Sequence, residues 1–228
     1  MITGLELIFA TSLGLQAASP LTRVAGLTCE PQPMTEISVV WSSDTITYDS
    51  SKSQSQLSNM PIDTKSPYSS HVATKVGGLM RGGLEVTTDI NISALNSPFY
   101  KQSCLWVRDI KINININPTI FIASEYKKGS CMYNAVMQHE LKHIQVDRDI
   151  ANKYQDQLRS MASSVAQKIG IVGPKSTLES KLTHKKIVQY IETHMAMVND
   201  KMYAERRALQ QNVDTLEEYE RVQAQCRN

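Results

Sequence analysis

The sequence predicts an α+β protein in which a β-rich amino-terminal half, with mostly antiparallel strands, is followed by a long two-helix hairpin. Residues 30–125 are rich in Ser, Thr, Asn and Gly and carry short apolar, β-branched runs, a pattern typical of strands separated by turns. From about Cys131 the apolar residues recur three and four positions apart, as they do in helices. We expect residues 20–228 to form one domain, with residues 131–225 as the hairpin.

The clearest expected strand covers residues 110–117, where isoleucine alternates with polar residues. This alternation places four isoleucines on one buried face and polar groups on the other. Pro118 ends the register because it has no backbone donor, and residues 119–123 continue as an edge strand or bend. Four glycines bracket a loop or hairpin: Gly77, Gly78, Gly82 and Gly83. Further strands are expected at residues 37–41, 45–48, 72–76 and 84–92.

Two long helices are expected in the second half of the chain. The first begins near Cys131 and extends as far as Ile169, after which two glycines and a proline at residues 170–174 end it. Ser176 and Glu179 have the spacing of a capping box, so a second helix should begin there. Its apolar residues continue toward Tyr219.

Composition excludes several classes of protein. The chain has 228 residues, of which 41% are hydrophobic and 20% charged, with a net charge of +2. A chain of this length can bury a sizeable core without a metal or disulfides, so a metal site would serve function before stability. No run of five basic residues occurs, and we therefore expect neither nucleic acid as a partner nor a polybasic membrane anchor.

The amino terminus has the general shape of an export signal. An apolar stretch at residues 5–15 precedes small residues that end at Pro20, so residues 1–19 are a possible signal peptide. The stretch is too short to span a bilayer, and we expect no integral span in the mature chain. No Lys or Arg precedes it and Glu6 interrupts it, so a first strand or helix of the fold is the alternative. The expected location is the periplasm or the exterior.

Four cysteines lie far apart in the sequence and never as CxxC: Cys29, Cys104, Cys131 and Cys226. An even number in an exported chain predicts two disulfides, for which three connectivities are possible. We favour Cys104 with Cys131 and Cys29 with Cys226. The alternative is four free thiols in a cytosolic protein.

The chemistry is predicted by an HExxH motif, His139-Glu140-Leu141-Lys142-His143, within the first expected helix. Residues i and i+4 share one helical face, so the two imidazoles can converge on one zinc ion while Glu140 reaches a zinc-bound water. Glu140 would take the proton from that water as general base. The charged Lys142 would have to point to solvent.

A catalytic zinc ion usually has a third protein ligand. Asp147 lies one turn beyond His143, a position better suited to orienting an imidazole than to binding the same ion. Asp149 could bind only if the helix stopped after His143. The third ligand is therefore expected on the second helix, where the candidates are Glu192, His194, Asp200 and Glu205.

Among these candidates we prefer Glu205 as the third ligand. His194 lies three turns earlier on nearly the same face, so it is either the alternative ligand or a catalytic partner for the oxyanion. Tyr203 is a second candidate for the oxyanion role. For each of these side chains an ordinary solvated or packing role is the alternative.

The stretch at residues 129–147 resembles the active helix of a family of bacterial predicted secreted zinc-dependent proteases. Tyr203, Ala204 and Glu205 look like the later Tyr-Asp-x-Glu element of that family. The resemblance implies a zincin-like domain of gluzincin type with one zinc per chain. It also implies roles for four residues: zinc ligation by His139, His143 and Glu205, and base catalysis by Glu140.

The expected activity is zinc-dependent hydrolysis of peptide bonds in a peptide or protein substrate. Zincins hold an extended substrate against an edge strand beside the active helix, and residues 110–117 or 119–123 could supply that strand. Two alternatives remain open. One is a non-catalytic zincin-like protein that binds a cell-envelope partner through its helical hairpin, and the other is an amidase that uses the same centre on cell-wall peptides.

Overall fold

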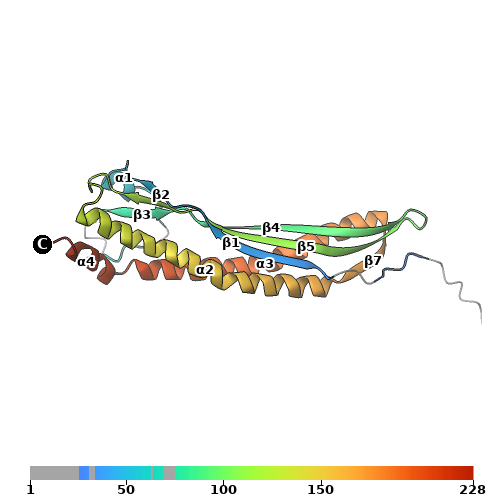
Figure 1. Cartoon of the computed structure of the whole chain (residues 1–228). Helices are drawn as coiled ribbons and strands as arrows, with labels where there is room; N and C mark the ends of the chain where they lie inside the picture. Colours follow the sequence, from blue (N-terminus) through green and yellow to red (C-terminus); the bar gives the residue numbers. More distant parts are fainter. Residues whose placement is uncertain (1–25, 31–33, 63, 69–74, 228) are drawn as a thin grey trace, which may run out of the picture.

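The structure is a computed structural model that describes residues 26–30, 34–62, 64–68 and 75–227. The possible signal peptide at residues 1–19 lies outside these ranges. The molecule is elongated, with strands along one side and long helices along the other (Figure 1). A β-rich amino-terminal half is followed by two long helices, which confirms the predicted α+β class.

The larger sheet is organised around β5 (Gln102–Ile116). Along one side β5 pairs antiparallel with β4 (Leu84–Ser97) over its whole length. Along the other side it pairs antiparallel with β7 (Ile171–Ser176) and, further on, parallel with β1 (Glu36–Ser43). β5 is therefore a central strand, and the expectation that residues 110–117 form an edge for substrate is wrong.

The predicted alternation along β5 is confirmed. Its four isoleucines at positions 110, 112, 114 and 116 are at most 1% exposed, whereas Lys111 and Asn113 between them are exposed. The isoleucines pack in one apolar cluster with residues of α2 (Cys131–Ile169) and α3 (Thr177–Val213). Both helices thus cover the apolar face of the sheet.

A smaller, three-stranded sheet follows the larger sheet beyond Pro118. β6 (Thr119–Ile122) lies between β2 (Thr47–Asp49), in parallel pairing, and β3 (Gly78–Arg81), in antiparallel pairing. The alternative position for an edge strand, residues 119–123, is therefore also central. Of the strand expected at 72–76, residues 72–74 lie outside the described ranges and residues 75–77 form no strand. The short helix α1 (Gln54–Ser58) precedes β3.

The boundaries of the two long helices agree with the sequence except at one end. α2 follows the N-cap Ser130 and ends at Gly170, which has a positive φ of 56°. α3 begins at the predicted capping box of Ser176 and Glu179. It does not continue toward Tyr219, because the chain turns at Asp214 and α4 (Leu216–Ala224) begins there. The strand β7 between the two helices was not expected from the sequence.

Two disulfides form, as predicted, but the favoured pairing is wrong. Cys29 bonds to Cys104, and Cys131 bonds to Cys226. β5 places Cys104 near the β4–β5 turn, at the opposite end of the molecule from the start of α2 (Figure 1). Cys104 therefore cannot reach Cys131. Two disulfides are typical of proteins that fold in an oxidising compartment.

Within the described ranges, no helix has the length and apolar character needed to cross a membrane.

Candidate metal centre

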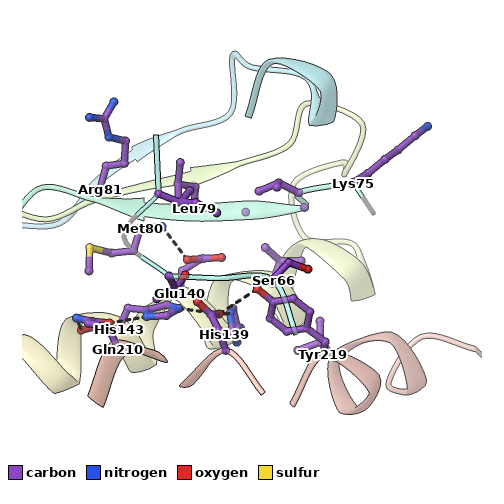
Figure 2. Close-up of a pocket in the computed structure, with 18 of the residues that line it drawn as sticks. Ser66, Lys75, Leu79, Met80, Arg81, His139, Glu140, His143, Gln210 and Tyr219 are labelled. Carbon is purple, nitrogen blue, oxygen red and sulfur yellow. Dashed lines mark hydrogen bonds and ion pairs between the residues drawn. The ribbon is translucent and has the colours of Figure 1, made fainter. Parts of the chain in front are cut away.

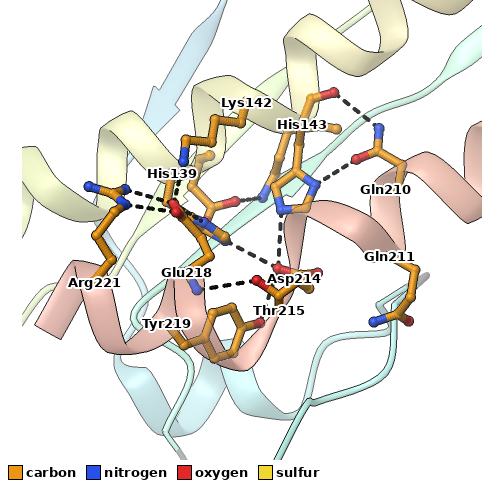
Figure 3. Close-up of polar contacts among 12 residues, drawn as sticks. His139, Lys142, His143, Gln210, Gln211, Asp214, Thr215, Glu218, Tyr219 and Arg221 are labelled. Atoms are coloured by element: carbon orange, nitrogen blue, oxygen red, sulfur yellow. Dashed lines mark hydrogen bonds and ion pairs between the residues drawn. The ribbon is translucent and has the colours of Figure 1, made fainter.

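The HExxH motif lies on the first half of α2, and its three functional side chains are buried: His139, Glu140 and His143. The two imidazoles are one helical turn apart, with ring centroids separated by 5.1 Å. Both rings face the corner at which α3 ends and α4 begins (Figure 3). The predicted convergence of the two histidines therefore exists in the folded chain.

Asp214 completes the cluster from that corner. Its Oδ1 atom lies 3.2 Å from Nε2 of His139 and 3.3 Å from Nε2 of His143. One ligand atom from each of these three buried residues lies within 4.8 Å of the other two, so the group could hold a metal ion.

Each imidazole is oriented through its other nitrogen. Nδ1 of His139 lies 3.3 Å from Oε1 of Glu218, and Nδ1 of His143 lies 2.5 Å from Oε1 of Gln210. These oxygens only accept hydrogen bonds, so each Nδ1 carries a proton and donates. Each Nε2 atom faces Asp214 Oδ1 and is the nitrogen that a metal ion would contact. Such outer partners fix the rings of metal-binding histidines.

A buried network behind His143 holds Gln210 in place. The Gln210 amide nitrogen donates to the His143 carbonyl oxygen at 3.0 Å and to Asp147 Oδ1 at 2.7 Å. Arg206 donates to both oxygens of Asp147, at 2.6 and 3.1 Å. Asp147 was expected to orient a ligand imidazole instead of binding the ion. It lies in that position, although it contacts His143 through Gln210.

Glu218 carries the corresponding role behind His139. Arg221 and Lys142 both donate to its carboxylate, and Lys142 Nζ lies 2.6 Å from Oε1. Arg221 first, then Lys142 and His139, lower the pKa of Glu218 to about 2. Lys142 is half-exposed, and its charge is balanced by α4. This contact explains a lysine in the middle of the motif, which was expected only to point to solvent.

Asp214 and His143 shift each other's pKa. Burial acts to lower the pKa of His143, but the hydrogen bond and the charge of Asp214, together with Glu140, outweigh burial and raise it. Burial acts to raise the pKa of Asp214, but hydrogen bonds from His139 and His143 hold it well below its ordinary value. Asp214 is therefore a carboxylate, as a metal ligand must be.

Glu140 lies beside the cluster but is not part of it. Its Oε2 atom accepts a hydrogen bond of 2.7 Å from the backbone N–H of Met80 on β3 (Figure 2). Burial raises its pKa, opposed by the positive charges of His139 and His143. The close approach of β3 requires Gly78, because a Cβ atom there would lie 2.3 Å from Val136 and 2.7 Å from Oε1 of Glu140.

The cluster opens into a pocket of about 480 Å³ between β3, α2 and the α3–α4 corner (Figure 2). Tyr219 lines this pocket, and its hydroxyl donates to Asp214 Oδ1 at 3.1 Å. Thr64 and Ser66 line another side of the pocket. The Gln211 side chain accepts from the Lys65 N–H at 2.8 Å and donates to the Lys65 carbonyl oxygen at 3.1 Å, and the Thr64 side chain bonds to Asp214.

Three side chains proposed from the sequence lie outside this cluster. Glu205 accepts hydrogen bonds from Lys153 and from the Tyr154 hydroxyl. Tyr154 is eleven residues beyond His143, about 16 Å further along α2. Because α3 runs antiparallel to α2, residues after Glu205 are the ones that face the histidines. Glu205 is thus an ion-pair partner of Lys153, and the carboxylate that lies beside both histidines is that of Asp214.

The two oxyanion candidates are engaged elsewhere as well. The Tyr203 hydroxyl donates to the Leu84 carbonyl oxygen at 3.1 Å. His194 uses Nδ1 on the carbonyl oxygen of Tyr190, 2.7 Å away, and packs on the Tyr190 ring. Neither residue lines the pocket.

Sequence reasoning missed four residues of the site: Gln210, Asp214, Glu218 and Tyr219. The sequence contains one pattern that could have indicated them. Thr215 and Glu218 have the same capping spacing as Ser176 and Glu179, and the Thr215 side chain does accept from the Glu218 N–H. A helix start at Thr215 implies a break just before it, and Asp214 is the acidic residue at that break.

Comparison with known proteins adds no relative: no protein-family model matches the chain, and neither the curated proteins nor the solved structures contain a significant match.

Proposed function

We propose that this protein is a zinc-dependent metallopeptidase of the cell envelope or the exterior, which hydrolyses peptide bonds. The observation that carries the proposal is the position of Glu140, a buried carboxylate beside a cluster of two imidazoles and one carboxylate, at the wall of an open pocket. A purely structural metal site needs no such base. The two disulfides support the location.

The donor set favours zinc over other ions. Two imidazole nitrogens and one carboxylate oxygen are a common catalytic zinc set, whereas Mg²⁺ and Ca²⁺ prefer oxygen ligands alone. For tetrahedral zinc with bonds of about 2.0–2.1 Å, neighbouring ligand atoms should lie about 3.3 Å apart. The distances from Asp214 Oδ1 to the two Nε2 atoms are 3.2 and 3.3 Å, which fits.

The reaction would depend on Glu140. A zinc ion held by the cluster would lower the pKa of a water molecule and polarise a substrate carbonyl group. Glu140 would accept a proton from that water and return it to the leaving amine. The Met80 N–H orients the carboxylate. The Tyr219 hydroxyl, which now donates to Asp214, could turn to the developing oxyanion.

The free side of β3 supports a peptide as substrate. The Gly77 carbonyl oxygen accepts from the Ala123 N–H, which follows β6, and the Gly83 carbonyl oxygen accepts from the Asn117 N–H, which precedes it. The backbone N–H and C=O groups of the odd-numbered residues from 77 to 83 therefore face β6. The backbone N–H and C=O groups of Gly78 and Met80 point the opposite way, toward the pocket. Among the described residues no further strand pairs with this side of β3. An extended peptide could add there by backbone hydrogen bonds to groups other than the Met80 N–H, which already donates to Glu140.

The test compares Glu140→Gln with the matched variant Glu205→Gln in zinc-loaded protein. Glu140→Gln should keep one zinc per chain in elemental analysis and lose peptide hydrolysis by about a thousandfold, the effect of removing a general base. Glu205→Gln should change neither property. Retained hydrolysis in Glu140→Gln would remove Glu140 from the mechanism.

The same assay distinguishes the proposed peptidase from the two alternatives, a non-catalytic binding protein and a cell-wall amidase. A non-catalytic binding protein would bind zinc but hydrolyse no peptide even as wild type. A cell-wall amidase would act on cell-wall peptides and leave protein substrates intact. Wild-type hydrolysis of a mixed peptide library is the result that the proposal requires.

A further inference from the structure

The end of the molecule opposite the metal centre carries exposed apolar side chains on two adjacent segments. Phe99 at the β4–β5 turn is 87% exposed, and Leu178 and Leu182 in the first turns of α3 are 81% and 56% exposed. The turn and the helix start lie together, because Ser176 pairs with Gln102 at the end of β5. We call this surface the distal patch, and it comprises Leu95, Phe99, Tyr100, Leu178 and Leu182.

The tip of the patch is an exposed aromatic pair. Phe99 and Tyr100 form an edge-to-face pair at the tip of the turn, with ring centroids 4.9 Å apart, and the turn projects from the end of the sheet (Figure 1). A convex tip of this kind suits a broad surface better than a narrow groove.

The exposed face of α3 alternates leucine with lysine. Leu178, Lys181, Leu182 and Lys185 follow the spacing i, i+3, i+4 and i+7, so they share one face of the helix, and all four are exposed. The opposite face is buried against the core through Ile187 and Ile191. This face therefore offers apolar side chains and lysines together, and both apolar burial and attraction to anionic lipids strengthen binding to a membrane surface.

Charge is concentrated at the same end. The segments 95–103 and 171–186 contain one acidic residue, Glu179, and five lysines. Glu179 is engaged in the α3 capping box with Ser176. These segments therefore carry a net charge of +4, whereas the whole chain carries +2. The five lysines are Lys101, Lys175, Lys181, Lys185 and Lys186.

We propose that the distal patch docks on the surface of an anionic lipid bilayer, with Phe99, Leu178 and Leu182 inserted among the headgroups and the lysines paired with lipid phosphates. Apolar insertion combined with basic charge is the pairing of signals that makes surface binding stable. This docking is independent of the metal centre. Along α2, 26 residues separate His143 from Ile169, so the bound protein would hold its metal centre about 40 Å from the docked end.

The experiment is flotation of purified full-length protein with vesicles of phosphatidylcholine alone or mixed with phosphatidylglycerol. The protein should float only with the anionic vesicles, and added salt should release it. Because each lysine near an anionic surface contributes about fivefold to binding, Lys181→Glu/Lys185→Glu should weaken binding by at least about 25-fold. Phe99→Ser/Leu178→Ser should weaken it independently of salt.

Two control variants match these changes elsewhere on the surface. Lys127→Glu/Lys128→Glu reverses two exposed lysines at the metal-centre end, and Met197→Ser removes an exposed apolar side chain from α3 outside the patch. Both should float like the wild type. The proposal is overturned if the wild type ignores anionic vesicles, or if the controls lose binding as the patch variants do. Dimerisation that Phe99→Ser/Leu178→Ser abolishes, without vesicle binding, would assign the patch to a protein contact.

Discussion

The two ends of this protein are stabilised by different kinds of contact. The distal end is built from long strands and the facing halves of α2 and α3, which share an apolar cluster of 20 buried residues. The cluster at the metal-centre end has seven. By contrast, seven of the ten buried polar residues in the described part of the chain gather at the metal-centre end. They are His139, Glu140, His143, Asp147, Arg206, Gln210 and Asp214.

This difference indicates that the buried residues of the two ends do not contribute equally to stability. Burying a polar group costs free energy unless it is paired, and burying a charge costs more. An end with the smaller apolar core that nevertheless buries most of the charges is poorly explained by stability alone. Its charges are arranged around one point, between His139, His143 and Asp214. The distal end supplies most of the apolar core, and the other end holds a cluster of buried residues that could bind a metal ion.

The largest expected effect is the loss of stability on removal of either disulfide, and only one of the two losses should also lower zinc affinity. Cys131–Cys226 and Cys29–Cys104 join residues 95 and 75 positions apart. In the chain-entropy model their loss should cost similar free energies of unfolding, about 4.7 and about 4.5 kcal/mol. Only Cys131–Cys226 ties α4 to the start of α2. Cys131→Ser/Cys226→Ser should therefore lower zinc affinity as well, and Cys29→Ser/Cys104→Ser should not.

Denaturant unfolding at low temperature measures the two stabilities, and zinc titration against a competing chelator measures the affinities. Equal loss of zinc affinity in both double variants would show that the two ends are coupled. The metal-centre end would then not be stabilised independently of the distal end.

The next effect distinguishes Asp214 from Glu205 as the third ligand. Loss of an outer partner costs a metal site roughly 10- to 100-fold in affinity, so loss of a ligand should cost at least about 100-fold, or about 2.7 kcal/mol. We expect Asp214→Ala to show this loss and Glu205→Ala to show none. The reverse result, measured by the same titration, would place the third ligand on α3 as the sequence suggested.

The sequence predicted the distal end better than the metal-centre end, for a physical reason. The alternation of Ile110 to Ile116 and the capping box of Ser176 and Glu179 are local patterns, and local patterns decide strands and helix starts. The HExxH pair is local too, since one helical turn brings His139 and His143 together. These features could be predicted from short stretches of sequence.

The rest of the site depends on contacts between distant residues. Asp214 is 71 positions from His143 and reaches it only because the chain turns between α3 and α4. The preference for Glu205 assumed an uninterrupted helix in a register that the sequence does not state. The disulfide pairing failed similarly, because β5 carries Cys104 to the far end of the molecule. Only the capping spacing of Thr215 and Glu218 indicated the turn.

A smaller effect is expected from Gln210, which accepts a hydrogen bond from His143 and would not itself bind the metal ion. Gln210→Leu keeps the shape but removes the acceptor for His143 Nδ1 and a donor to Asp147. Zinc affinity should fall roughly 10- to 100-fold. The control is Gln155→Leu, which removes a glutamine of the distal half of α2 that donates to the Val39 carbonyl oxygen. If both variants bind zinc equally, Gln210 has no role in orienting the ligand.

The smallest effect concerns access to the site. Thr64 and Ser66 line one wall of the pocket, and the Gln211 side chain holds the backbone of Lys65 between them through two hydrogen bonds. Each such bond contributes only about 0.5–1.5 kcal/mol, so Gln211→Ala should free this wall without unfolding the protein. Zinc should then pass to an excess of chelator severalfold faster at unchanged affinity, whereas the exposed α3 variant Gln189→Ala should match the wild type. A rate that does not change would mean that zinc leaves the site without movement of residues 64–68.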